Sequence, residues 1–179
     1  MVKVKTLEKL IKSTATFSDN GLYRYKLTRI WDENKKKATV IMLNPSKANE
    51  LKTDKTVMNV TNFLIDNRYG GIIIVNLFSY MTTYPNELKN RNEDYEKLNE
   101  KYILEAFEEA DTIIIAWIRN GQKYIKDEKE KIESKLVPYK NKTRCFVDGS
   151  GKIIRHPRDL GENWSLTEYK FEQLTGESL

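Results

Sequence analysis

Cysteine and histidine are almost absent from this chain of 179 residues, which contains one of each, Cys145 and His156. A single cysteine excludes an internal disulfide and fits a reducing compartment. Two such residues are also too few for the common zinc sites, which draw most of their four ligands from cysteine and histidine. We therefore expect no metal site and no cofactor, and we expect Cys145 to pack inside a strand.

Long hydrophobic runs and glycine-rich phosphate loops are absent too. No apolar stretch approaches the ~20 residues of a membrane span, and the N-terminal segment 1–10 is too polar for a signal peptide. Neither a G-x-G-x-x-G nor a Walker loop occurs, so neither a dinucleotide-binding nor a P-loop fold is favoured. The length and the 32% of charged residues indicate one soluble domain, which we expect to be cytoplasmic.

Charge is distributed unevenly around a net value of +5. Residues 87–111 carry four Lys/Arg against nine Asp/Glu, whereas residues 119–144 carry nine Lys/Arg against four Asp/Glu. We expect one acidic and one basic face, as in a protein that meets an anionic polymer on one side. The alternative is that both segments are simply solvated helix faces.

Four apolar runs rich in β-branched residues predict the core strands of a sheet, at residues 38–43, 72–76, 112–117 and 143–147. Helical patterns separate them. The first begins at an N-cap in Thr53-Asp54, the second is a long acidic helix, and the third spans about residues 122–136. The inward stripe of the acidic helix is predicted to be Tyr95, Leu98, Tyr102 and Ala106. This alternation predicts a three-layer α/β/α domain with a mainly parallel central sheet.

The two ends of the chain are predicted to add smaller elements to this domain. The alternating segment Leu22–Trp31 is typical of an antiparallel strand at a sheet edge. Residues 1–20 are expected to form an N-terminal helical extension with a short helix at Leu7–Lys12, and another short helix is expected at Leu166–Leu174. The whole chain, residues 1–179, is thus interpreted as a single α/β domain.

The core strands end in polar or aromatic motifs. The first ends in Asn44-Pro45-Ser46, the second in Asn76-Leu77-Phe78 and the third in Trp117-Ile118-Arg119-Asn120, and His156-Pro157 follows the last strand. Proline cannot continue a sheet ladder, so the chain must turn at Asn44. Because parallel strands place their carboxyl ends on one rim, where open α/β sheets bind ligands, we expect these motifs to line a single crevice.

Four of these motifs, in this order, resemble the signature of the domain-of-unknown-function family 1643. They are Val40–Ser46, Asn76-Leu77-Phe78, Ile115-Ala116-Trp117 and His156-Pro157, and the resemblance covers about residues 22–165. More distantly, the same positions are similar to the uracil-DNA glycosylase superfamily. There, one strand ends in a water-positioning loop, a second ends in an asparagine that reads the base, and a late His-Pro loop follows. The resemblance implies a glycosylase-like α/β fold.

The resemblance also implies roles for individual residues. Asn44 would hold a water for attack on a glycosidic carbon, and His156 would stabilise the charge that develops on the leaving base. Asn76 would bond the edge of an extruded base, since an amide offers both a donor and an acceptor. The residues expected to contact the substrate are Pro45, Ser46, Asn76, Phe78, Tyr80 and Trp117, with Phe78 or Tyr80 stacking on the base. Those expected to contact nucleic acid are Arg119, Asn120, Lys152, Arg155 and Arg158.

The chain departs from the glycosylase plan in three places. Trp117-Ile118-Arg119 stands where a Trp-Gly turn is expected, and the loop after His156 lacks the serines of a DNA-kinking loop. No carboxylate stands beside Pro45 to act as a general base. Asp54 would be an alternative base if the loop after Ser46 folds back over the crevice, and otherwise it is a helix cap.

Three hypotheses of function follow. The first is an N-glycosylase that acts on an extruded uracil-like or modified base in DNA or in a nucleotide. The second is a non-catalytic module that recognises a base or nucleotide in the same crevice without cleaving it. Residue by residue, the structural alternative is that the two asparagines are turn residues and that Phe78, Tyr80 and Trp117 are packing residues. The third is a phage or mobile-element protein that binds other proteins through its acidic and basic faces.

Overall fold

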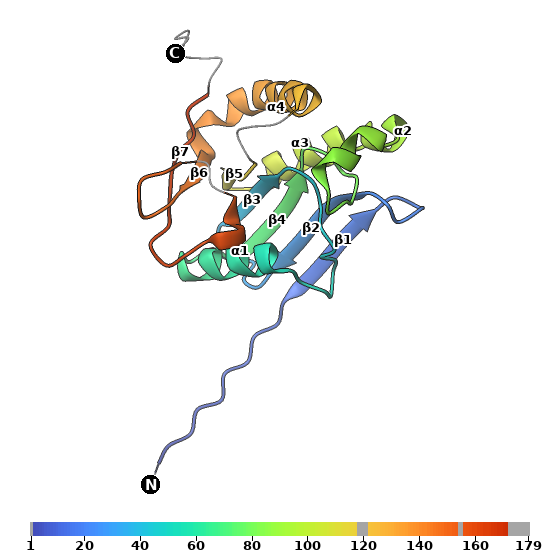
Figure 1. Ribbon diagram of the computed structural model, residues 1–179. Coiled ribbons are helices and arrows are strands. Elements are labelled where there is room, and N and C mark those ends of the chain that lie inside the picture. Colours follow the sequence, from blue (N-terminus) through green and yellow to red (C-terminus); the bar gives the residue numbers. More distant parts are fainter. Residues whose placement is uncertain (1, 118–121, 154–155, 172–179) are drawn as a thin grey trace.

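One mixed sheet organises the part of the chain that the structure describes, and seven strands form it in the order β1-β2-β4-β3-β5-β6-β7 (Figure 1). The structure is a computed structural model that describes residues 2–117, 122–153 and 156–171. The strands are β1 (Lys12–Phe17), β2 (Arg24–Ile30), β3 (Lys37–Met42), β4 (Gly71–Asn76), β5 (Thr112–Ile115), β6 (Thr143–Val147) and β7 (Ser165–Glu168). Strands β4, β3, β5 and β6 run parallel, whereas the pairs β1–β2, β2–β4 and β6–β7 are antiparallel. The predicted α/β fold with a mostly parallel sheet is confirmed.

Helices cover both faces of this sheet. They are α1 (Lys55–Asp66), α2 (Glu93–Glu96), α3 (Asn99–Glu109) and α4 (Lys123–Leu136), with the 3-10 helices η1 (Pro85–Asn90), η2 (Val137–Lys142) and η3 (Pro157–Asp159). Side chains of a strand alternate between faces. Accordingly, Ile73 and Val75 of β4 share a hydrophobic core with α3 and α4, while Ile72 and Ile74 share a second core with α1. Figure 1 shows α1 on one side of the sheet and α3 and α4 on the other.

Helix α1 forms where the sequence predicts it. The Asp54 carboxylate Oδ1 accepts a hydrogen bond from the Val57 backbone N–H at 2.8 Å, which satisfies one of the unpaired donors of the first turn. Val57, Val60 and Leu64 are buried against the sheet, as their spacing indicates. Asp54 is therefore fixed at the start of a helix that packs on one face of the sheet.

The strand predicted for the sheet edge lies inside the sheet. Strand β2 pairs with β4 on one side and with β1 on the other, so β1 is the edge strand. The prediction of a helical extension at residues 1–20 is also wrong. Lys12–Phe17 is a strand, and residues 2–11 form no helix. A short isolated helix is marginal without packing, whereas the Thr-rich segment after it gains a full ladder against β2.

The predicted C-terminal helix is replaced by β7 in the described part of that segment. Leu166 and Thr167 pair with Phe146 and Cys145 of β6. The pairing extends the sheet on its far side, and the buried Cys145 packs within β6 as expected. Here the tertiary pairing overrides a weak local helical pattern.

The predicted long acidic helix is divided into η1, α2 and α3. Asn92 caps α2 by accepting a hydrogen bond from the Asp94 N–H at 2.8 Å, and a turn at residues 97–98 separates α2 from α3. Leu98, expected to point inward, is 50% exposed, whereas Ile103 and Phe107 of α3 are buried. The side-chain cap at Asn92 thus overrides one continuous apolar stripe.

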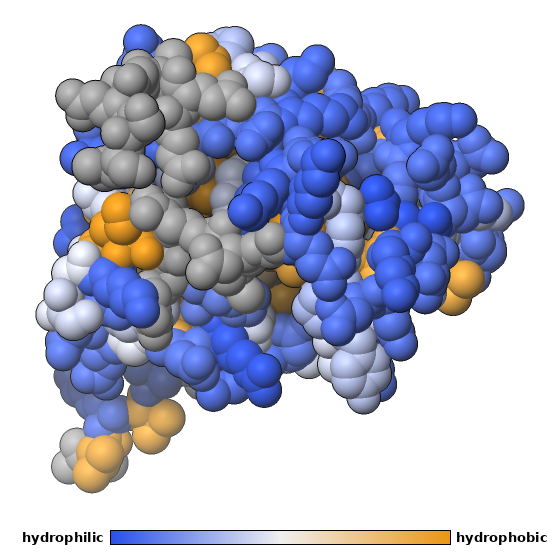
Figure 2. Space-filling model, turned by 45° about the horizontal axis from the view of Figure 1, so that its top comes forward, coloured by the Kyte–Doolittle hydropathy of each residue, from blue (hydrophilic) through white to orange (hydrophobic). Residues whose placement is uncertain are grey.

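The acidic and basic segments lie next to each other on the same face of the sheet. Glu100 of α3 forms salt bridges with Lys131 at 2.9 Å and with Lys135 at 3.4 Å, both on α4. Figure 2 shows a surface that is mainly hydrophilic, with hydrophobic residues in small separate groups. The expectation of opposite acidic and basic faces is therefore corrected, because part of each charge neutralises the other. Among the residues described, no helix combines the length and apolar composition needed to cross a bilayer.

Candidate functional site at the carboxyl ends of β3 and β4

The loops that leave β3 and β4 lie side by side. Met42 at the end of β3 is in register with Asn76 at the end of β4. The pairing continues beyond both strands, since the Leu77 N–H donates to the Met42 carbonyl at 2.9 Å and the Phe78 N–H donates to the Leu43 carbonyl at 3.0 Å. Two of the motifs predicted to share a crevice are thus brought together. The chain passes from β3 to β4 on one side and crosses to β5 on the other, so the switch point, where α/β sheets bind ligands, lies between the carboxyl ends of β3 and β5. The loop after β3 borders both this point and the loop after β4.

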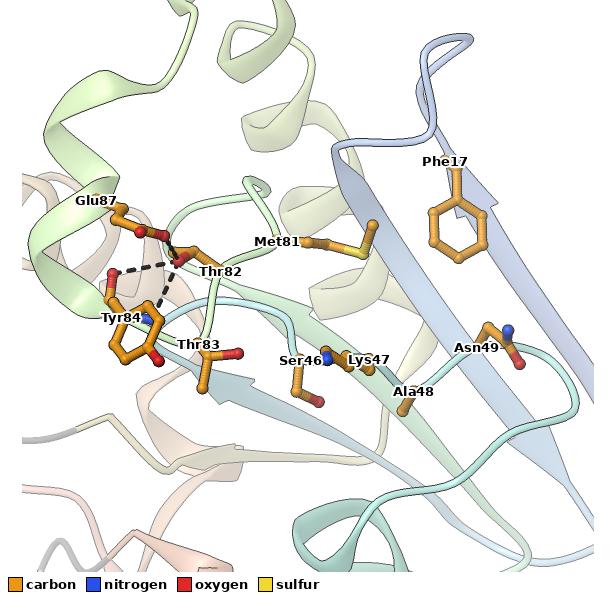
Figure 3. A pocket seen from close by; sticks show the side chains of 10 residues that line it. All are labelled: Phe17, Ser46, Lys47, Ala48, Asn49, Met81, Thr82, Thr83, Tyr84 and Glu87. Carbon is orange, nitrogen blue, oxygen red and sulfur yellow. Dashed lines mark hydrogen bonds between the residues drawn. The ribbon is translucent and has the colours of Figure 1, made fainter.

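A pocket of about 480 Å³ opens between these loops and the end of β1 (Figure 3). One wall comes from the loop after β3, the other from the loop after β4 and the start of η1, and Phe17 closes the side next to β1. The lining residues are Phe17, Ser46, Lys47, Ala48, Asn49, Met81, Thr82, Thr83, Tyr84 and Glu87. Pockets of this size hold small ligands such as a nucleotide.

Asn44 ties the two loops together. Its amide Nδ2 donates to the Thr82 carbonyl at 2.6 Å and to the Pro45 carbonyl at 3.2 Å. Both N–H groups are therefore used inside the protein, and the side-chain oxygen is the atom that remains to hold a water. Pro45 is buried and Ser46 is exposed on the pocket wall.

Asp54 is the carboxylate that contacts the loop after β3. The loop after Ser46 folds back, and the Ser46 hydroxyl donates a hydrogen bond to Asp54 Oδ2. The other carboxylate oxygen caps α1, so the orientation of the group is fixed by two hydrogen bonds. Asp54 is thus the helix cap that the sequence predicts, and it contacts Ser46, which lines the pocket.

The loop of His156 packs on α1 near Asp54. The Asn59 side chain donates to the Arg158 carbonyl at 2.8 Å, and Lys55 forms a salt bridge with Asp159 at 3.5 Å. His156 Nδ1 accepts a hydrogen bond from the Arg158 N–H at 3.2 Å, which leaves the proton of the neutral ring on Nε2. Burial, followed by the positive charge of Arg158, lowers the pKa of His156, against an opposing effect of Asp159 and Asp54. The imidazole is thus set up as a neutral donor.

This pKa shift predicts how stability depends on pH. The pKa of His156 is lower in the folded protein than its ordinary value of 6.5, so the unfolded chain binds the proton first as pH falls. Stability is therefore expected to decrease as pH drops below about 6.5, until the folded protein is also protonated. His156→Asn keeps an acceptor for the Arg158 N–H and should flatten this dependence in melting curves between pH 5.5 and 7. An unchanged slope in the variant would show that other groups cause it.

Asn76 lies under Arg24 rather than at the surface. Both side chains are 1% exposed. Arg24 Nη2 donates to Asn76 Oδ1 at 3.3 Å, and Arg24 Nη1 donates to the Ala48 carbonyl at 2.6 Å. Burial lowers the pKa of Arg24 to about 10, so it remains a cation at neutral pH and anchors the loop after β3. The Asn76 Nδ2 group is buried without a hydrogen-bond partner in the described structure.

Arg24 is the functional candidate that sequence reasoning missed. It stands between two tyrosines in a charged, alternating strand, where an arginine is normally expected to point to solvent. The feature that indicates its buried position is its place at the start of β2, opposite the end of the antiparallel strand β4. That position is known only once the pairing of the two strands is known.

The aromatic side chains predicted to contact a base are mostly in the core. Phe78 and Trp117 are 1% and 2% exposed. Arg91 lies over the Phe78 ring at 4.8 Å, and Tyr169 packs against Trp117 at 6.4 Å between ring centroids. Tyr80 is half-buried and contacts the Tyr23 ring at 5.3 Å. Phe78 and Trp117 are therefore core packing residues, and neither ring is available for stacking on a base in this structure.

Glu96 holds the loop that carries Tyr80. Its carboxylate accepts hydrogen bonds from the Ser79 N–H at 2.9 Å, the Ser79 hydroxyl at 3.0 Å and the Tyr80 N–H at 3.0 Å. Burial raises the pKa of Glu96, while these hydrogen bonds act in the opposite direction. The wall of the pocket that begins at Met81 is therefore fixed from behind by α2.

The residues predicted to contact nucleic acid are only partly described. Arg119, Asn120 and Arg155 lie outside the described residues. Lys152 is exposed after the turn at residues 148–151, and Arg158 is exposed in η3 next to His156. Arg158 thus lies next to His156 on the loop that packs against α1, whereas Lys152 follows the turn after β6.

Fold and site together define a mixed α/β protein with a candidate ligand site at the carboxyl ends of neighbouring parallel strands. The chain belongs to the family described as "Protein of unknown function (DUF1643)", whose model matches residues 24–158. The resemblance to this family, predicted over about residues 22–165, is thereby confirmed. The chain has no match among curated proteins.

Proposed function

We propose that the chain recognises a nucleobase, in DNA or in a nucleotide, and hydrolyses its N-glycosidic bond at the carboxyl end of β3. The observation that carries this proposal is the meeting of Ser46 and Asp54 beside the pocket. It supports Asp54, the alternative base that the sequence offers, as the general base of the reaction. His156 supports the proposal, because it is close enough to Asp54 for the carboxylate charge to act on its imidazole.

The proposed reaction assigns one task to each group. A water held by Asn44 Oδ1 and Asp54 attacks the anomeric carbon and gives its proton to the Asp54 carboxylate. The electrons of the C–N bond leave with the base, and the His156 Nε2–H donates to the charge that develops there. The distant likeness to uracil-DNA glycosylases, including their three-layer architecture, belongs to this proposal and is supported by the order of the four motifs.

Substitution of Asp54 tests the catalytic part of the proposal. Asp54→Asn keeps an N-cap for α1 but removes the negative charge and the proton acceptor. We expect base release to fall by about 100-fold or more, the range typical of a lost general base. The measurement is formation of abasic sites or free base from DNA and nucleotides carrying normal, uracil-like and modified bases. Asp66→Asn, at the exposed end of the same helix, is the matched control and should leave the rate unchanged.

His156→Asn provides an independent check. It preserves the acceptor that orders the loop but removes the Nε2–H donor. Slower base release with an unchanged melting temperature at pH 7.5 would support the assigned role. If the wild-type protein releases no base from any substrate, the hydrolytic proposal is wrong.

A second function, recognition without cleavage, is favoured by a different observation. The Asn44 N–H groups and the Asn76 carbonyl are already bound to protein groups, so these side chains also serve to build a rigid crevice. A binding module of this kind would retain nucleotides or DNA without releasing base. Its affinity for DNA would fall steeply with salt if cations such as Arg158 contact phosphates.

A further inference from the structure

The pocket between the two loops combines apolar walls with one anionic end. Phe17, Met81 and Tyr84 provide aromatic and thioether surface, and Figure 3 shows the Met81 side chain pointing towards Phe17. Tyr84 is 67% exposed at this site, which is unusual for so large a ring. Flat aromatic molecules are the ligands that such walls favour, because ring stacking and thioether contacts both add to apolar burial.

Glu87 forms the anionic end and is held in place. The Thr82 hydroxyl donates a hydrogen bond to Glu87 Oε2, and it accepts one from the Tyr84 N–H at 3.0 Å. Figure 3 shows these three residues clustered at one end of the pocket. Fixing one carboxylate oxygen in this way leaves Oε1 as an oriented acceptor.

An ionised carboxylate can only accept hydrogen bonds, and this decides which ring fits against it. An exocyclic amino group, as in cytosine or adenine, donates to it, as carboxylates do with the cytosine amino group in DNA recognition. A carbonyl at the same ring position, as in uracil or thymine, places lone pairs against lone pairs. We infer that this pocket takes a nucleobase bearing an exocyclic amino group, an inference that rests on the proposed recognition of nucleobases.

The rest of the pocket fits the remainder of a nucleotide. The volume of about 480 Å³ exceeds the needs of a single base. Lys47 lies on the other loop, apart from Glu87, and supplies a cation for a phosphate group (Figure 3). Ser46 lines the same pocket and bonds Asp54, so a nucleotide bound here has the proposed catalytic carboxylate beside it.

The test compares two ligands that differ at this exocyclic group and in the hydrogen on the neighbouring ring nitrogen N3. Deoxycytidine monophosphate and deoxyuridine monophosphate are titrated into the full chain, and dissociation constants are measured by calorimetry. The wild-type protein should bind the cytidine nucleotide about tenfold more tightly, the difference expected for one charge-assisted hydrogen bond. Glu87→Gln should remove this preference, because glutamine offers both a donor and an acceptor. Phe17→Ala should weaken both ligands equally.

Glu50→Gln, an exposed glutamate on the loop after β3, is the matched control and should keep the preference. Equal or tighter binding of the uridine nucleotide by the wild-type protein overturns the inference and leaves the proposed function intact. Persistence of the cytidine preference in a folded Glu87→Gln variant overturns it as well. Absence of binding by either nucleotide, together with absence of base release, rejects the proposed function and this inference with it.

Discussion

Arg24→Met is expected to lower the free energy of unfolding by about 3 kcal/mol, because it leaves two buried acceptors unpaired. The acceptors are the Ala48 carbonyl and Asn76 Oδ1, which Arg24 now bonds at 2.6 and 3.3 Å. Methionine fills much of the space of the side chain and avoids burying a cation, so the loss reflects the missing hydrogen bonds. Urea unfolding followed by tryptophan fluorescence measures the effect.

Two further variants separate the contributions of Arg24. Arg24→Lys retains the charge, but its single amine cannot reach both loops in the geometry of the guanidinium fork, so we expect an intermediate loss. Arg68→Met, at an exposed position after α1, is the control and should change stability by less than about 0.5 kcal/mol. If Arg24→Met is as stable as the wild type, Arg24 does not anchor the loop after β3.

Glu96→Ala is expected to lower the free energy of unfolding by about 2–3 kcal/mol, because three donors lose a charged acceptor. The donors are the backbone N–H groups of Ser79 and Tyr80 and the hydroxyl of Ser79. The same loop continues into the pocket wall at Met81, so nucleotide binding should weaken as well. Chemical denaturation measures the loss of stability, and calorimetric titration of the same sample measures the loss of nucleotide affinity.

The controls for Glu96 lie on the same short helix. Glu96→Gln keeps one acceptor but turns its NH₂ group towards other donors, so it should be less destabilising than alanine. Glu93→Ala, exposed in the first turn of α2, should have little effect. A Glu96→Ala protein with wild-type stability would mean that water replaces the carboxylate behind the loop.

The parallel strands of the sheet were predictable because the sequence pattern that indicates each of them lies within a few consecutive residues. Each of the central strands is an apolar run of β-branched residues, and the predicted segment 38–43 differs from β3 (Lys37–Met42) by one residue at each end. Burial on both faces requires such runs whatever the neighbours are. The cap at Asp54 and the stripe of α1 were predictable for the same reason, since both act within one helix.

The edges of the sheet were not predictable in this way. Whether Leu22–Trp31 lies at the edge depends on whether another strand pairs beside it. The strand that does so, β1, comes from the predicted N-terminal extension, whose polar sequence has no clear strand pattern. The acidic segment before β5 shows the same limitation. Its apolar stripe fits one helix, but the cap at Asn92 and the burial of Asn99 divide it.

The candidate site shows most clearly which features follow from the sequence and which depend on the tertiary structure. The sequence by itself determined that polar motifs such as Asn44-Pro45-Ser46 and Asn76-Leu77-Phe78 end core strands, because strand ends and prolines are local features. Only the tertiary structure decided that Arg24 is buried against Asn76, that Phe78 packs in the core, and that Asp54 meets Ser46. The physical reason is that periodicity tells which face a side chain occupies, whereas its partner is chosen by packing between segments distant along the chain.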